Sequence, residues 1–137
     1  MSSNIAMGGN KVTGLGAASA NGDALRYEQI VVPYTNASFT AGWRNTDAAT
    51  FNSCQYRKVG SKVELKGMAT RASGTSTTIF NLPAGYRPAR YTTLVCANSG
   101  GYGRIDISTS GDVVASVGTI GSSAWHSLNN LSFEVAA

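Results

Sequence analysis

Apolar and polar residues alternate in two short stretches near the middle of the chain, and both stretches predict β-strands. In residues 62–66 (KVELK), Val63 and Leu65 alternate with charged residues, which is the period-two pattern of a strand with one buried face. Residues 104–108 (RIDIS) repeat the pattern, and turn residues separate them from another apolar run. Residues 103–117 therefore predict a β-hairpin.

The same alternation closes the chain, where Leu131, Phe133 and Val135 are separated by polar residues. We expect this last strand to pack into the core. Further strand signals lie near residues 38–45, 50–59, 76–82 and 90–98, with Gly-rich turns between them. About eight short strands with short connections predict an all-β fold, an antiparallel β-sandwich or jelly-roll-like knob. No segment has the length of a crossover helix, so an α/β enzyme fold is excluded.

The first 30 residues have a different character, because they are rich in Gly, Ala, Ser and Asn. We predict an N-terminal arm at residues 1–30 and a β-sandwich knob domain at 31–137. Within the arm, the turn at Asn21 and Gly22 leads to Asp23, a helix N-cap residue, and residues 24–29 then predict two helical turns. A helix this short needs a partner, either its own domain or copies of itself around a symmetry axis.

Charge and hydropathy exclude several function classes. Charged residues make up 13% of the chain, and the formal net charge is +4, but the basic residues are scattered between Lys11 and Arg104. This pattern does not predict nucleic-acid binding, which needs a basic cluster or stripe. No apolar run approaches the roughly 20 residues of a membrane span, and the N-terminus lacks a signal-peptide pattern. We therefore expect no membrane insertion, and synthesis in the cytoplasm.

Metal binding and cofactors are not expected either. Cys54 and Cys96 lie in apolar, strand-like runs, where a free cysteine behaves as a small buried hydrophobe. This interpretation is favoured over a disulfide, although the sequence does not settle their redox state. Two cysteines and the single histidine, His126, do not make a four-ligand zinc site.

Two sets of short stretches carry a resemblance to a known class of protein. The sequence NKVTGLGA at residues 10–17, followed by GDALRY at 22–27, resembles a motif common in phage tail-fibre proteins near the junction of three chains. The stretches YRKVGSKVELKG at 56–67, IFNLPAGYRP at 79–88 and GRIDI at 103–107 are similar to knob domains at the ends of phage fibres.

The resemblance implies a homotrimer. In that interpretation Leu15, Ala24 and Leu25 pack on the threefold axis and Asp23 caps the short helix. The alternative is an arm that lies on its own domain. The predicted trimerisation or attachment residues are Val12, Leu15, Asp23, Ala24, Leu25 and Tyr27.

The most specific part of the second resemblance is the LPAGYRP loop, which also has a physical rationale as a rigid crossing between strands. Its prolines fix φ at two points, and its glycine permits a positive φ. We expect Arg87 to hydrogen-bond loop carbonyls rather than to contact a ligand. The predicted structural-loop residues are Leu82, Pro83, Gly85, Tyr86, Arg87 and Pro88.

Catalysis is not expected. Glycoside hydrolysis usually needs two facing carboxylates, and the seven carboxylates of the chain are assigned to other places. Asp23 is a cap, whereas Glu64, Asp106 and Glu134 are placed on the polar faces of strands. A serine nucleophile would need His126 as its base. The serine next to His126 is not expected to meet its side chain, because neighbouring strand residues point to opposite faces.

Recognition is better served by aromatic and arginine side chains on turns. The predicted surface-recognition residues are Tyr102, Arg104, Trp125 and His126. For Trp125, packing in the core or at a subunit interface is the stronger alternative, and for Tyr102 it is an equal one. Trp43 is expected to be buried.

Together, the residues and the resemblance predict a bacteriophage virion structural protein that binds rather than catalyses. The first hypothesis is a homotrimeric tail-fibre or tail-tip knob that contacts a glycan or protein of the host surface. The alternative is a trimeric capsid decoration, or cement, protein on the phage head. Expected partners are further copies of the chain and other virion proteins, either the baseplate and tail or the major capsid protein.

Overall fold

The computed structural model describes residue 14 and residues 16–20, 31–118 and 123–135. The chain divides into two units, Met1–Val32 and Pro33–Ala137, and the second is described below. Its described residues form eleven strands and no helix. The strands are β1 (Thr35–Asn36), β2 (Trp43–Asn45), β3 (Gln55–Val59), β4 (Lys62–Lys66), β5 (Met68–Arg71), β6 (Thr78–Asn81), β7 (Thr92–Asn98), β8 (Gly101–Ile107), β9 (Asp112–Val117), β10 (Trp125–Ser127) and β11 (Leu131–Glu134).

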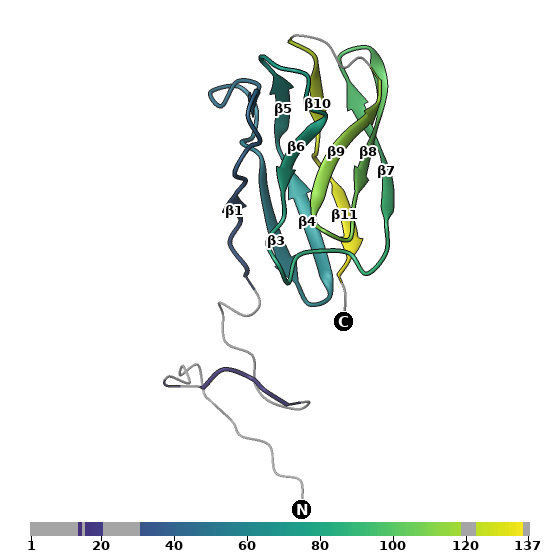
Figure 1. Cartoon of the computed structure of the whole chain (residues 1–137). Coiled ribbons are helices and arrows are strands. Elements are labelled where there is room, and N and C mark those ends of the chain that lie inside the picture. Colours follow the sequence, from purple (N-terminus) through teal and green to yellow (C-terminus); the bar gives the residue numbers. More distant parts are fainter. Residues whose placement is uncertain (1–13, 15, 21–30, 119–122, 136–137) are drawn as a thin grey trace, which may run out of the picture. The chain divides into compact units, whose positions relative to one another are not determined.

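The strands form two antiparallel sheets, as the sequence predicts (Figure 1). The smaller sheet has the order β1-β3-β4-β11, and the larger has the order β2-β5-β10-β7-β8-β9-β6. The predicted hairpin at residues 103–117 is confirmed as β8 and β9, with Gly111 at a φ of 95° in its turn. The all-β sandwich prediction is therefore confirmed.

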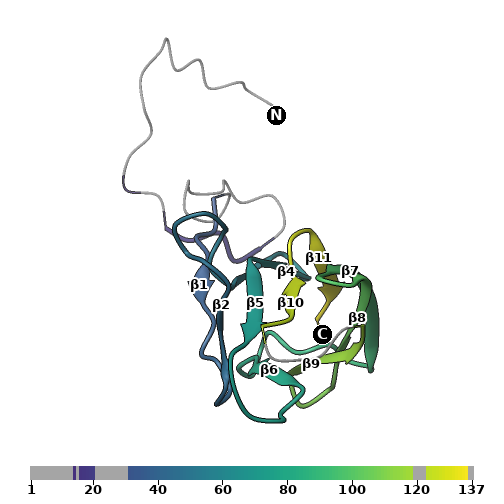
Figure 2. The same ribbon diagram turned by 90° about the horizontal axis from the view of Figure 1, so that it is seen from above.

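The seven-stranded sheet curls until its two edges approach each other, which makes the domain nearly barrel-shaped. Viewed from above, its strands follow one another around the domain from β2 to β6 (Figure 2). Phe39, just before β2, forms a β-bridge with Phe80 of β6. The amide of Thr40 also donates to the Ile79 carbonyl at 2.9 Å. These contacts protect backbone groups that an open edge would leave unpaired.

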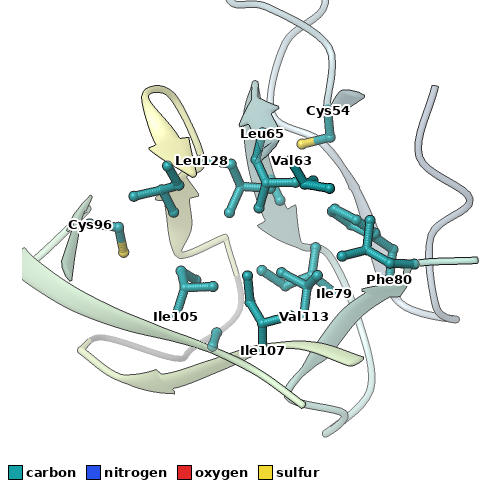
Figure 3. Close-up of a cluster of buried hydrophobic side chains, with 14 of the residues drawn as sticks. Cys54, Val63, Leu65, Ile79, Phe80, Cys96, Ile105, Ile107, Val113 and Leu128 are labelled. Carbon is teal, nitrogen blue, oxygen red and sulfur yellow. The ribbon is translucent and has the colours of Figure 1, made fainter. Parts of the chain in front are cut away.

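The core lies between the two sheets, where the inward positions of the alternating strands meet (Figure 3). Val63 and Leu65 are fully buried, as their alternation with charged residues predicts. Leu131 and Phe133 of the closing strand are also buried, and Trp43 is inside, as expected. Cys54 and Cys96 are free thiols within this core, and the burial of Cys54 raises the pKa of its thiol to about 12. The free-cysteine interpretation is thus confirmed.

A sharp corner joins β4 to β5 at Gly67, which has a φ of 109°. A Cβ atom there would lie 2.4 Å from the Ser53 carbonyl oxygen and 2.5 Å from the Cα of Cys54. Only glycine fits this position, because both the backbone conformation and the neighbouring chain exclude a side chain. The corner lets the chain leave the smaller sheet and enter the larger one.

Several strand predictions were wrong in number or extent. Eleven strands replace the expected eight, because β1, β5 and β10 were not expected. In β5, Ala69 and Thr70 are buried one after the other, so no alternation marks the strand. Of the strand expected at 50–59, only 55–59 forms, since Asp47 caps a turn by accepting from the Ala49 amide and the Thr50 hydroxyl. The helix expected at 24–29 lies outside the described residues.

Candidate recognition surface

The predicted recognition residues divide into an exposed pair on β8 and a less exposed pair on β10. Tyr102 of β8 is 85% exposed, and the side chain of Arg104 is 47% exposed. Trp125 of β10 is half-buried, and His126 is fully buried. The prediction of His126 as a surface residue is therefore wrong, because β10 is an interior strand of the larger sheet rather than an exposed turn.

Tyr102 and Arg104 belong to an exposed, partly apolar face of the larger sheet. In the register of β7 and β8, Val95 lies opposite Arg104, and Ala97 lies opposite Tyr102. Opposed residues in antiparallel strands point to the same face. We call this surface the β7–β8 face and define it by its exposed members, Tyr91, Val95, Tyr102, Arg104 and Val117.

Exposed apolar residues gathered on one face often mark a place where a protein contacts another molecule. Val95 is 72% exposed, and Tyr91, just before β7, is 63% exposed. Ala97, the partner of Tyr102, lies six positions after Tyr91, so the two tyrosines stand about 20 Å apart along the strands. Tyrosine offers contact area at a low entropic cost, so this face is suited to recognition.

Asp106 anchors the centre of the β7–β8 face. It is 2% exposed and forms an ion pair with Arg104, with 3.0 Å between Nη2 and Oδ2. Burial raises the pKa of Asp106, but hydrogen bonds from Ser116, Thr93 and Arg104 outweigh burial, so its pKa lies below the ordinary value. Asp106 lies on the polar face of β8, as expected, but it is buried there because neighbouring side chains cover it. Its carboxylate instead holds the Arg104 guanidinium in a fixed position.

A shallow hollow of about 350 Å³ lies beside Tyr102. Val95, Ala97 and Tyr102 line one side, and Ser127 and Asn129 from the segment around the end of β10 line the other. Its volume falls within the range of small-ligand sites, about 300–1,000 Å³. The β7–β8 face therefore combines exposed aromatic rings, a fixed cation and a hollow with polar groups at its rim.

His126 has a structural role in the interior rather than a role in surface recognition. Its Nε2 lies 2.8 Å from Asn98 Nδ2, and its ring packs edge-on against Trp43 with 5.9 Å between centroids. Because Asn98 Oδ1 accepts from the Gly100 amide at 2.7 Å, its Nδ2 faces the imidazole and Nε2 is the acceptor. Burial, together with the charge of Arg71, lowers the pKa of His126. The imidazole is therefore neutral and out of reach of a surface ligand.

The LPAGYRP loop makes the kind of contacts that the sequence predicts. Arg87 Nε donates to the Leu82 carbonyl at 2.8 Å, and Gly85 has a φ of 89°. Tyr86 packs edge-on against Tyr56, with 5.0 Å between ring centroids. Arg87 is thus engaged within the loop. The predicted trimerisation residues, Val12, Leu15, Asp23, Ala24, Leu25 and Tyr27, lie outside the described residues, and their role stays a prediction.

Sequence reasoning missed a polar groove of about 580 Å³ on the outer face of the smaller sheet. Its lining includes Tyr34, Arg57, Glu64, Lys66 and Asn130. The alternation in KVELK places Glu64 and Lys66 on the wet face of β4. Their meeting with Tyr34 and Arg57 depends on strand pairing that no local pattern encodes. We call this site the small-sheet groove.

Within the described part of the chain, no three His, Cys, Asp or Glu side chains gather as metal ligands. The described residues include no helix that is long and apolar enough to cross a membrane.

Comparison with known proteins yields a similarity of fold alone. No family model matches the chain, and no curated protein matches its sequence. Among solved structures, the receptor binding protein gp15 of Listeria phage PSA is similar, with a TM-score of 0.60 and 16% sequence identity. The match covers 77% of this chain and 66% of that chain, so this chain spans just under two thirds of the similar protein.

Proposed function

We propose that this chain is a structural protein of a bacteriophage particle, a tail appendage that recognises the host surface by binding and not by catalysis. The observation that carries the proposal is the fold shared with a phage receptor binding protein, at a TM-score of 0.60. The NKVTGLGA and LPAGYRP motifs, which resemble tail-fibre sequences, support the same assignment independently of the fold. The fold comparison favours a tail location over capsid decoration, because the similar protein is a receptor binding protein.

The β7–β8 face supplies the recognition surface in this proposal. Tyr102 is almost fully exposed and makes no contribution to the core, while Arg104 is held by Asp106. Aromatic and arginine side chains contribute most of the binding energy in protein interfaces. Because Tyr102 is so exposed, its replacement should change binding without changing stability.

The test uses fluorescently labelled full-length protein and the strain infected by the phage that encodes it. We expect saturable binding to these cells, and at least a tenfold loss of affinity for Tyr102→Ala, since truncated hot-spot aromatics cost about 2 kcal/mol or more. Thr109→Ala, a change in the β8–β9 turn, is the control and should bind like the unmodified protein. Absence of saturable binding would contradict the recognition role.

We also propose that the protein assembles as a homotrimer through its N-terminal arm. The resemblance of residues 10–17 and 22–27 to tail-fibre junctions supports this arrangement. Native mass measurement should give about three times the 14.2 kDa chain mass, and Leu15→Asp together with Leu25→Asp should reduce it to one chain. A native mass of one chain for the unmodified protein at micromolar concentration would contradict the trimer.

A further inference from the structure

The small-sheet groove has the chemistry of a sugar site that carries one cation. From the side chains that line this groove we infer that it binds an anionic saccharide, a sugar bearing a carboxylate or phosphate group. The inference rests on the proposed recognition role and adds a ligand class and a second surface to it. The groove lies on the smaller sheet, whereas the β7–β8 face belongs to the larger one.

Cross-strand pairing builds the floor of the groove. Glu64 of β4 lies between Arg57 of β3 and Ser132 of β11, its direct partners on either side. Arg57 Nε donates to Glu64 Oε2 at 2.7 Å, and this hydrogen bond to Glu64 is the main cause that raises the pKa of Arg57. The Tyr34 hydroxyl reaches the same oxygen at 3.4 Å. Arg57 and Glu64 therefore balance each other's charge.

Lys66 supplies the unbalanced charge. Its Nζ lies 4.1 Å from the centroid of the Tyr34 ring, and Arg57 Cζ lies 4.4 Å from the same centroid. The ring thus holds both cations at the groove. Among the described residues, no carboxylate forms an ion pair with Lys66. A cation that is already positioned loses less freedom when it binds an anion, and this preorganisation favours affinity.

The remaining lining is suited to hydroxyl groups. Asn52, Asn129 and Asn130 are exposed at the groove, and each amide both donates and accepts hydrogen bonds. Ser132 adds a hydroxyl, whereas the apolar lining residues Leu65 and Leu131 are buried. A polar lining that offers donors and acceptors together fits a saccharide better than an apolar peptide. A single unbalanced cation is also too few for a nucleic-acid backbone, which needs several phosphate contacts.

The test follows backbone amide chemical shifts of the full chain by NMR during titration with four probes. Trigalacturonic acid carries carboxylates, glucose 1-phosphate carries a phosphate, maltotriose is a neutral sugar, and inorganic phosphate is a bare anion. We expect shifts around Tyr34, Lys66 and Asn130 with one or both anionic sugars, and weaker binding of maltotriose and inorganic phosphate. The probe that binds more tightly identifies the acid group.

Two variants on the same strand separate a specific site from general charge attraction. Lys66→Gln should weaken binding of the anionic sugar about tenfold, because a hydrogen bond to a charged group is lost. Lys62→Gln removes the same charge from the same face of β4, about 13 Å away along the strand, and should change affinity by less than twofold.

Three results would overturn the inference. These are no shifts at the groove with either anionic sugar, equal weakening by the two lysine variants, or inorganic phosphate binding as tightly as the sugars. Failure of the recognition role has a different signature. If the groove binds the anionic sugar but the protein does not bind host cells, the result supports the sugar site and contradicts the proposed recognition of the host surface.

Discussion

The buried pair of His126 and Asn98 makes the stability of the domain sensitive to mild acid. Burial lowers the pKa of His126 in the folded protein, whereas in the unfolded chain it has the ordinary value of about 6.5. Between these two pKa values the unfolded chain binds more protons than the folded one. Stability is therefore complete above about pH 6.5 and is lost as the pH falls below it.

The size of this effect can be bounded. One pH unit in that window lowers the free energy of unfolding by up to about 1.4 kcal/mol, so the loss at pH 5.0 reaches at most about 2 kcal/mol. His126 is the single histidine of the chain, and the pKa of the buried Asp106 lies below the ordinary value. The change between pH 6.5 and 5.0 is thus assigned to one side chain.

Urea unfolding at a fixed protein concentration, at five pH values from 7.5 to 5.0, measures this loss. We expect His126→Gln to be less stable at pH 7.5 by about 1–3 kcal/mol, because a buried partner of Asn98 is disturbed. Its stability should be nearly constant between pH 6.5 and 5.0. If the unmodified protein shows the same constant stability, or if NMR shows that the folded imidazole titrates at or above 6.5, the reasoning is refuted.

Three other predictions concern the core and the corner between the sheets. Gly67→Ala should destabilise the domain by more than about 2 kcal/mol in urea unfolding, because the added Cβ would meet the Ser53–Cys54 backbone. Gly60 has open space around it, so Gly60→Ala should cost only about 1–2 kcal/mol, for its positive φ. Equal losses of stability in the two variants would contradict this. Cys54, with its thiol pKa raised to about 12, should react with a thiol reagent only after unfolding, and fast labelling of the native protein would show that the site is open. Phe80→Ala, at a fully buried position, should cost about 3–5 kcal/mol, and a loss below 1 kcal/mol would contradict the core assignment.

Strands with one wet face could be predicted from the sequence. Val63 and Leu65 in β4, and Leu131 and Phe133 in β11, alternate with polar residues, and their burial follows that alternation. The hairpin of β8 and β9 was predicted from its turn residues. These features depend on residues that are close together in the sequence, so a local sequence pattern is enough to predict them.

Features that depend on distant partners could not be predicted in this way. The strand β10 is only three residues long, so it shows no clear alternation. The burial of His126 depends on its pairing with Asn98, which is 28 residues away in the sequence. Asp106 follows the alternation of an exposed position but is covered by residues outside its own strand. The small-sheet groove likewise requires Tyr34, Arg57 and Lys66 to be brought together by the pairing of separate strands.

Labelling of intact phage particles tests the central claim most directly. Gold-conjugated antibody against this protein would be applied to particles of the phage that encodes it and imaged by electron microscopy. The proposed recognition role predicts label confined to the tail or its tip. Label spread over the head, or particles without label, would contradict it.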